Sequence, residues 1–126
     1  MERRVISSGS PYEAKVGYSR AVIVDRHVYV SGTAPTMPEN ADPPVDGYGQ
    51  ARRCLEIILD ALAQAGAGPE HVVRTRMFVT GAEHMESIGR AHAEVFGESR
   101  PANTTVVTGL LDPRWVVEIE AEALLP

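Results

Sequence analysis

The alternation of apolar residues with glutamates near the C-terminus is the feature that most restricts how this chain can fold. The apolar positions of the run are Val117, Ile119, Ala121 and Ala123, and the acidic positions are Glu118, Glu120 and Glu122. Successive side chains of a β-strand point to opposite faces, so the run predicts a strand with one face in the core and a row of carboxylates on the other. We look for the function on the carboxylate face.

Five further runs of β-forming residues precede this strand, which we predict over Trp115–Leu124. The predicted strands are Arg3–Ser7, Arg20–Val24, His27–Gly32, His71–Val79 and Ala102–Thr108. Within His71–Val79, alternation predicts Val73, Thr75, Met77 and Val79 on one face. A turn around Asp112-Pro113 joins the last two strands.

Two stretches change to the helical period. Leu55, Ile58, Leu59 and Leu62 recur at i, i+3, i+4 and i+7, the apolar stripe of an amphipathic helix from about Gly49 to Ala65. A second helix is predicted from about Glu83 to Phe96. The segments Ser8–Tyr18 and Thr33–Gly49, rich in Gly, Ser or Pro, are predicted as surface loops.

The element order β-β-β-α-β-α-β-β predicts an α+β protein, formed by a single domain over residues 1–126. Two helices can cover only one face of the sheet. The other face would carry Arg74, Arg76 and the glutamate row beside apolar groups. Because this face mixes apolar and charged side chains, we expect other copies of the chain to bury part of it in a closed homo-oligomer.

Composition restricts the partners. The formal net charge of -5 argues against general affinity for nucleic acid or anionic membranes. No apolar run approaches the ~20 residues that span a bilayer, and the N-terminal MERRVISS lacks the apolar region of a signal peptide. A single cysteine, Cys54, excludes an intrachain disulfide and suits a reducing compartment, so we expect a cytoplasmic protein.

Short motifs distributed along nearly the whole chain carry a family resemblance. They are Gly17-Tyr18, Val30-Ser31-Gly32, Gln50-Ala51-Arg52, Ala65-Gly66, Val72-Val73-Arg74-Thr75, Phe78-Val79, Arg100-Pro101-Ala102 and Val117-Glu118-Ile119-Glu120-Ala121. In their order and spacing, these motifs resemble the RidA/YjgF family, whose members are also called L-PSP endoribonuclease-like proteins.

The resemblance implies a chorismate-mutase-like fold and a homotrimer, in which three sheets surround a central barrel and clefts lie between subunits. RidA hydrolyses reactive enamines and imines, such as 2-aminoacrylate, to a keto acid and ammonia. The resemblance therefore implies a small-molecule ligand and neither a metal nor an organic cofactor.

The resemblance also assigns roles to individual residues. Tyr18 matches the tyrosine that lines the cleft, Ser31 and Gly32 match a Ser-Gly turn beside it, and Glu118 matches the glutamate that positions the attacking water. Thr105 stands where the family has a cysteine in the cleft.

Asn103 occupies the position of the arginine that binds the substrate carboxylate in RidA. An amide cannot make the charged, bidentate contact of a guanidinium. Losing a charge-assisted hydrogen bond costs about 1.5–3 kcal/mol, roughly ten- to a hundredfold in binding. We therefore predict little ordinary activity toward 2-imino acids.

Four other arginines could supply a compensating charge: Arg74, Arg76, Arg100 and Arg114. The favoured interpretation is that they pair with Glu120, Glu122 or solvent instead.

Two functions stay open at this point. One is a Rid-like hydrolase or deaminase that acts on a small imine, enamine or related compound without a critical carboxylate, using Glu118 and water. The other is a non-catalytic trimer whose clefts bind a small metabolite. A ribonuclease ranks below both, because the sequence has no catalytic His pair, no aromatic stacking platform and no basic stripe.

Overall fold

A six-stranded sheet with the strand order β1-β2-β3-β6-β4-β5 forms the frame of the molecule. The computed structural model describes all 126 residues. The strands are β1 Arg3–Ile6, β2 Ala21–Val24, β3 His27–Thr33, β4 Val72–Val79, β5 Ala102–Val107 and β6 Val117–Leu124, and the helices are α1 Gly47–Ala65 and α2 Met85–Phe96. Short helical turns lie at Glu13–Gly17, Pro38–Asn40, Pro69–His71 and Ala82–His84. The predicted order of strands and helices is confirmed.

The strands pair in a mixed pattern. β4 and β5 are parallel, and all other neighbours are antiparallel. β5 and β6 follow each other in the chain, but β4 lies between them in the sheet. The segment around Asp112-Pro113 therefore crosses over the end of β4, and β5 becomes an edge strand.

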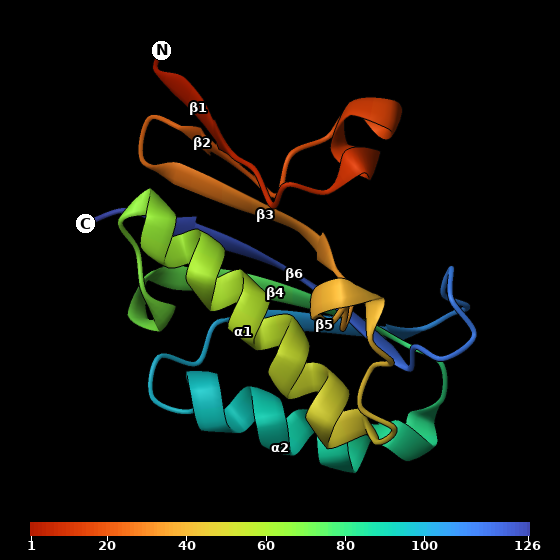
Figure 1. Cartoon of the computed structure of the whole chain (residues 1–126). Coiled ribbons are helices and arrows are strands. Elements are labelled where there is room, and N and C mark those ends of the chain that lie inside the picture. The colour runs from red at the N-terminus through yellow and green to blue at the C-terminus, as the bar shows by residue number, and fades with distance from the viewer.

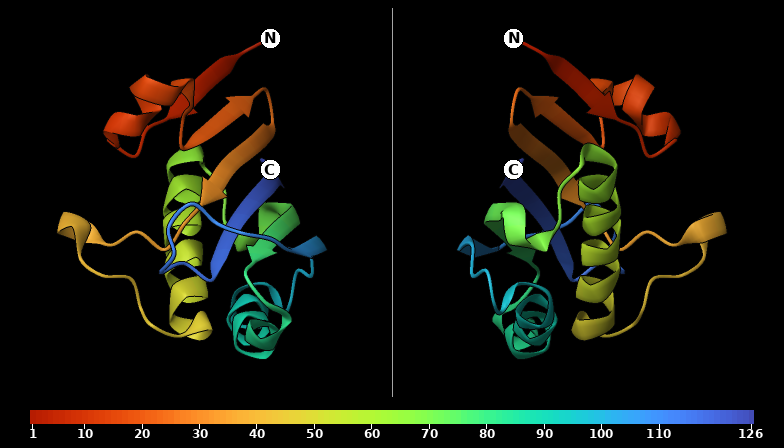
Figure 2. Two further views of the ribbon diagram at one scale, coloured as in Figure 1. Left: turned by 90° about the vertical axis from the view of Figure 1, so that its right-hand side faces the viewer. Right: turned by 90° about the vertical axis from the view of Figure 1, so that its left-hand side faces the viewer.

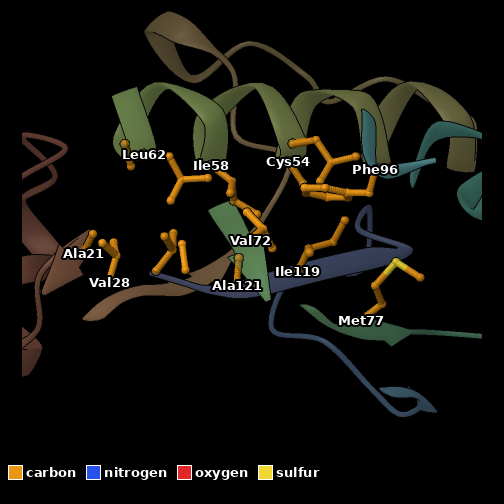
Figure 3. Close-up of a cluster of buried hydrophobic side chains, with 14 of the residues drawn as sticks. Ala21, Val28, Cys54, Ile58, Leu62, Val72, Met77, Phe96, Ile119 and Ala121 are labelled. Carbon is orange, nitrogen blue, oxygen red and sulfur yellow. The ribbon is translucent and has the colours of Figure 1, made fainter. Parts of the chain in front are cut away.

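Both helices pack on one face of the sheet (Figures 1 and 2). A core of 22 buried apolar residues lies between the two layers. Figure 3 shows α1 side chains such as Ile58 and Leu62 pointing toward the strands. The predicted alternation in β6 is confirmed, since its four apolar side chains are at most 2% exposed.

The opposite face of the sheet has no covering layer within the chain. Apolar side chains remain open to solvent on it, among them Tyr29 at 46% and Val106 at 42% exposure. The three glutamates of β6 share this face and are half-buried. No helix is long and apolar enough to span a membrane.

Four local predictions are corrected by the structure. Glu13–Gly17 forms a π-helical turn within a predicted loop. α1 begins at Gly47 rather than Gly49, because the Asp46 side chain caps the helix by accepting from Gly49 N at 3.1 Å. β6 begins at Val117 instead of Trp115. Val73 does not face the core, because a register shift between Val72 and Arg74 leaves it 46% exposed.

Candidate active site

A bulge in β3 brings its end close to β6. The register between the two strands shifts between Val30 and Thr33, so Ser31 and Gly32 form an irregular step in the ladder. Thr33 returns to the core face and is fully buried. Bulges of this kind redirect side chains and are frequent beside active sites.

The carboxylate of Glu118 lies directly against Gly32. A Cβ atom at position 32 would be 2.5 Å from Oε2 of Glu118, closer than real Cβ atoms approach. The Glu118 carboxylate can therefore hold this position only because residue 32 has no Cβ. The Ser31 hydroxyl anchors the same bulge by donating to Ser19 O at 2.6 Å.

Arg20 completes this cluster, although none of the sequence motifs pointed to it. Its Nη2 donates to Ser31 O at 2.9 Å and to Gly32 O at 2.7 Å. The sequence did contain a signal for the position of Arg20. Arg20 alternates with Ala21 and Ile23, which are core residues, and so falls on the same side of its strand as Val22 and Val24. Alternation therefore places Arg20 on the face that carries Glu118.

Burial raises the pKa of Glu118, and Glu120 adds a smaller effect in the same direction. The positive charge of Arg20 acts against this shift and lowers the pKa of Glu118. Tyr18 lies two residues before Arg20 in the chain and is 38% exposed. Ser31, Gly32 and Glu118 are thus gathered around Arg20, and the glutamate is a stronger base than an exposed carboxylate.

Asn103 and Thr105 lie on the edge strand β5, apart from the cluster around Arg20. Asn103 pairs with Thr75 in the ladder between β4 and β5, and Thr75 is fully buried under α2. Paired residues share a face, so Asn103 faces the helical side. Glu118 pairs with Phe78 and faces the open side. A single chain therefore does not bring the amide and the glutamate into one pocket.

The four arginines that could replace the missing cation are largely engaged. Arg76 binds Glu120 at 3.0 Å and Glu122 at 3.1 Å, which confirms the predicted pairing. Arg114 binds other carboxylates, those of Asp42 at 2.7 Å and Asp112 at 2.9 Å. Arg100 Nε donates to Gly97 O at 3.0 Å. Arg74 lies opposite Glu122 in the ladder between β4 and β6.

The remaining reactive residue types do not form a second site. Cys54 is fully buried, and burial raises the pKa of its thiol, which keeps it protonated and unreactive. No three side chains among His, Cys, Asp and Glu are grouped so that they could hold a metal ion.

Replacing Arg20 by methionine should raise the pKa of Glu118 further. The substitution removes the cation that favours the ionised carboxylate and keeps an apolar stem that buries it. A ¹³C NMR titration of the glutamate carboxyl groups measures this directly. Arg52→Met on the exposed side of α1 is the control and should leave the pKa of Glu118 unchanged. An unchanged or lower value in Arg20→Met would contradict the electrostatic role of Arg20.

The geometry defines a class of protein: an α+β chain with one mixed sheet, two helices on one face, and a glutamate held at a strand bulge on the other. The chain belongs to the family described as Endoribonuclease L-PSP, whose sequence profile matches residues 9–125. Membership of the RidA/YjgF group, expected from the motifs, is thereby confirmed.

Individual relatives agree over almost the full chain. The Streptomyces coelicolor protein SCO2049 is 36% identical over 121 residues, which cover 95% of this chain and 90% of that protein. The crystal structure of Rv2704 from Mycobacterium tuberculosis, a member of the YjgF/YER057c/UK114 family, is 42% identical, with a TM-score of 0.89 over 98% of this chain and all of that one. The Rid family protein YyfA from Yersinia pestis is 28% identical, with a TM-score of 0.87 over 98% of this chain and 100% of that one.

Proposed function

We propose that this protein is a Rid-like hydrolase that deaminates a small reactive imine, enamine or related metabolite at clefts between the subunits of a homotrimer. The observation that carries the proposal is the half-buried Glu118, whose pKa is raised and whose carboxylate is fixed against Gly32 beside Arg20. A carboxylate with a raised pKa is suited to general base catalysis near neutral pH.

In the proposed reaction, Glu118 accepts a proton from water as the water oxygen attacks the carbon of the C=N bond. Glu118 passes this proton to the imine nitrogen, which gives a neutral carbinolamine with a hydroxyl and an amine. In the second step the hydroxyl loses its proton, the amine gains one, and the C–N bond breaks with its electron pair leaving on ammonia. The oxygen forms the C=O bond of the carbonyl product. Atoms and charges balance without a metal ion or an organic cofactor.

In the proposed trimer, a neighbouring subunit supplies the part of the cleft that one chain lacks. Glu118 and Asn103 face opposite sides of the same sheet, so a complete cleft needs the glutamate of one copy and the edge strand β5 of another. The uncovered sheet face, with Tyr29 and Val106 exposed beside charged residues, supports such an assembly. Nucleic acid and membranes are not among the proposed partners, and the free cysteine suits a cytoplasmic location.

The proposed substrate is not a standard 2-imino acid, because Asn103 replaces the arginine. We do not assign that role to Arg20, because its Nη2 donates to two carbonyl groups of the bulge and its charge acts on Glu118, whose pKa it lowers. A non-catalytic trimer that binds a small metabolite is the alternative, and the same asparagine favours it.

The test combines light scattering with ammonia release. We expect a trimer, little ammonia from 2-aminoacrylate generated in situ by the wild type, and a gain of this activity in Asn103→Arg. Glu118→Gln in that background should abolish the gain, whereas Glu98→Gln on the exposed surface should retain it. A monomer, or full turnover by the Glu118→Gln variant, would refute the proposal. Metabolite binding without any Glu118-dependent turnover would favour the non-catalytic alternative.

A further inference from the structure

A chain of hydrogen bonds running from α2 to the edge strand fixes the side chain of Asn103. The amide nitrogen of Asn103 lies 3.0 Å from Thr75 Oγ1 and 3.5 Å from the backbone oxygen of Thr75. On the outer side, Thr105 Oγ1 donates to Asn103 Oδ1 at 2.8 Å. On the inner side, Thr75 Oγ1 lies 2.8 Å from Nε2 of His92.

The partners determine which end of the amide faces inward. A backbone carbonyl can only accept a hydrogen bond, so the atom turned toward Thr75 O must be the amide nitrogen. The Thr75 hydroxyl accepts from that nitrogen and has His92 Nε2 as its other partner, to which it can donate its single proton. Burial lowers the pKa of His92, which favours the neutral ring with an accepting nitrogen.

The direction of donation is therefore the same at each step: Thr105 donates to Asn103, Asn103 to Thr75, and Thr75 to His92. The amide nitrogen is thus turned toward Thr75. Asn103 is itself exposed at the sheet edge, and its oxygen is the polar atom turned outward beside Thr105. No arginine comes within hydrogen-bonding distance of this amide, since Arg100 is turned to the carbonyl of Gly97.

We infer that this edge of the cleft selects a ligand group that donates a hydrogen bond, such as a carboxamide or hydroxyl, at the place where a 2-imino acid has its carboxylate. An arginine at this position would offer donors, whereas Asn103 offers an accepting oxygen with a free lone pair. A ligand carboxylate would place its own accepting oxygens against the accepting oxygen of Asn103, with no proton between them. This mismatch would make the site prefer a ligand group that donates a hydrogen bond. The inference rests on the proposed function, because it names the substrate class of the same cleft.

The probes are pyruvate and its carboxamide, pyruvamide, which differ only in the group in question. By NMR titration, the wild type should bind pyruvamide about tenfold more tightly than pyruvate, the effect of about one hydrogen bond. Thr75→Val keeps the shape of the buried side chain and removes the hydroxyl that holds the amide. The amide nitrogen then keeps only the long contact of 3.5 Å to the backbone oxygen of Thr75, so the amide is held less firmly and the preference for pyruvamide should fall.

Two further measurements separate the possible failures. The side-chain NH₂ resonances of Asn103 should shift in Thr75→Val while the unfolding midpoint stays close to that of the wild type, which excludes general loss of structure. Equal binding of both probes, tighter binding of pyruvate, or binding of neither overturns the inference. If the inference fails but ammonia release still depends on Glu118, the proposed function stands. If no ammonia release depends on Glu118, the proposed function fails, whichever probe binds.

Discussion

Replacing Gln50 by leucine should lower the free energy of unfolding by about 3 kcal/mol, because three backbone groups lose their partner in one step. Gln50 is fully buried at the start of α1. Its Nε2 donates to Pro44 O and to Arg114 O, both at 2.8 Å, and its Oε1 accepts from Val116 N at 2.8 Å. The side chain thus joins α1 to the segment that leads into β6 and Glu118.

Urea unfolding at a fixed protein concentration measures this loss. Gln64→Leu is the matched control, because Gln64 lies on the exposed side of the same helix and its side chain donates a hydrogen bond to Asp60 within that helix. The control should change stability by less than about 0.5 kcal/mol. Equal stability of the two variants would show that water replaces the partners of the buried amide.

The elements that depend on a local pattern could be predicted from the sequence. In β6 the strict alternation predicted both faces, and the observed burial of Ile119 and the position of Glu118, Glu120 and Glu122 on the opposite face follow from it. The stripe of Leu55, Ile58 and Leu62 likewise predicted the buried face of α1. In these segments one face meets a large core, so the local period and the global packing agree.

Features that depend on strand order could not be predicted in the same way. Asn103 and Glu118 are matched to one cleft by the motifs, but only the parallel pairing of β5 with β4 shows that they face opposite sides. Alternation places Arg20 on the face of Glu118, but its hydrogen bonds to Ser31 O and Gly32 O depend on the bulge, which local alternation does not reveal. The sequence showed Gln50 only as part of a family motif. Its structural role could not be predicted, because the fold brings its partners Pro44, Arg114 and Val116 to it.

Gly32→Ala should disable the site while it leaves the fold intact. The new Cβ would lie 2.5 Å from Glu118 Oε2, so one of the two must move. The carboxylate is the end of a flexible side chain and gives way more easily than the strand. Once displaced toward solvent, Glu118 loses the burial that raises its pKa, and we expect that pKa to fall toward its ordinary value.

In the Asn103→Arg background, where we expect turnover of 2-aminoacrylate, the displacement should also reduce Glu118-dependent ammonia release by about a hundredfold, since a misplacement of about 1 Å costs this much in a preorganised site. Gly109→Ala is the control, because a Cβ there meets nothing within 4 Å. The carboxyl titration of Glu118 checks the result without a substrate, and the unfolding midpoint shows whether the fold survives. A Glu118 that keeps its raised pKa and its activity in Gly32→Ala would mean that the strand yields instead of the carboxylate. The close approach of Gly32 would then not be what positions the base.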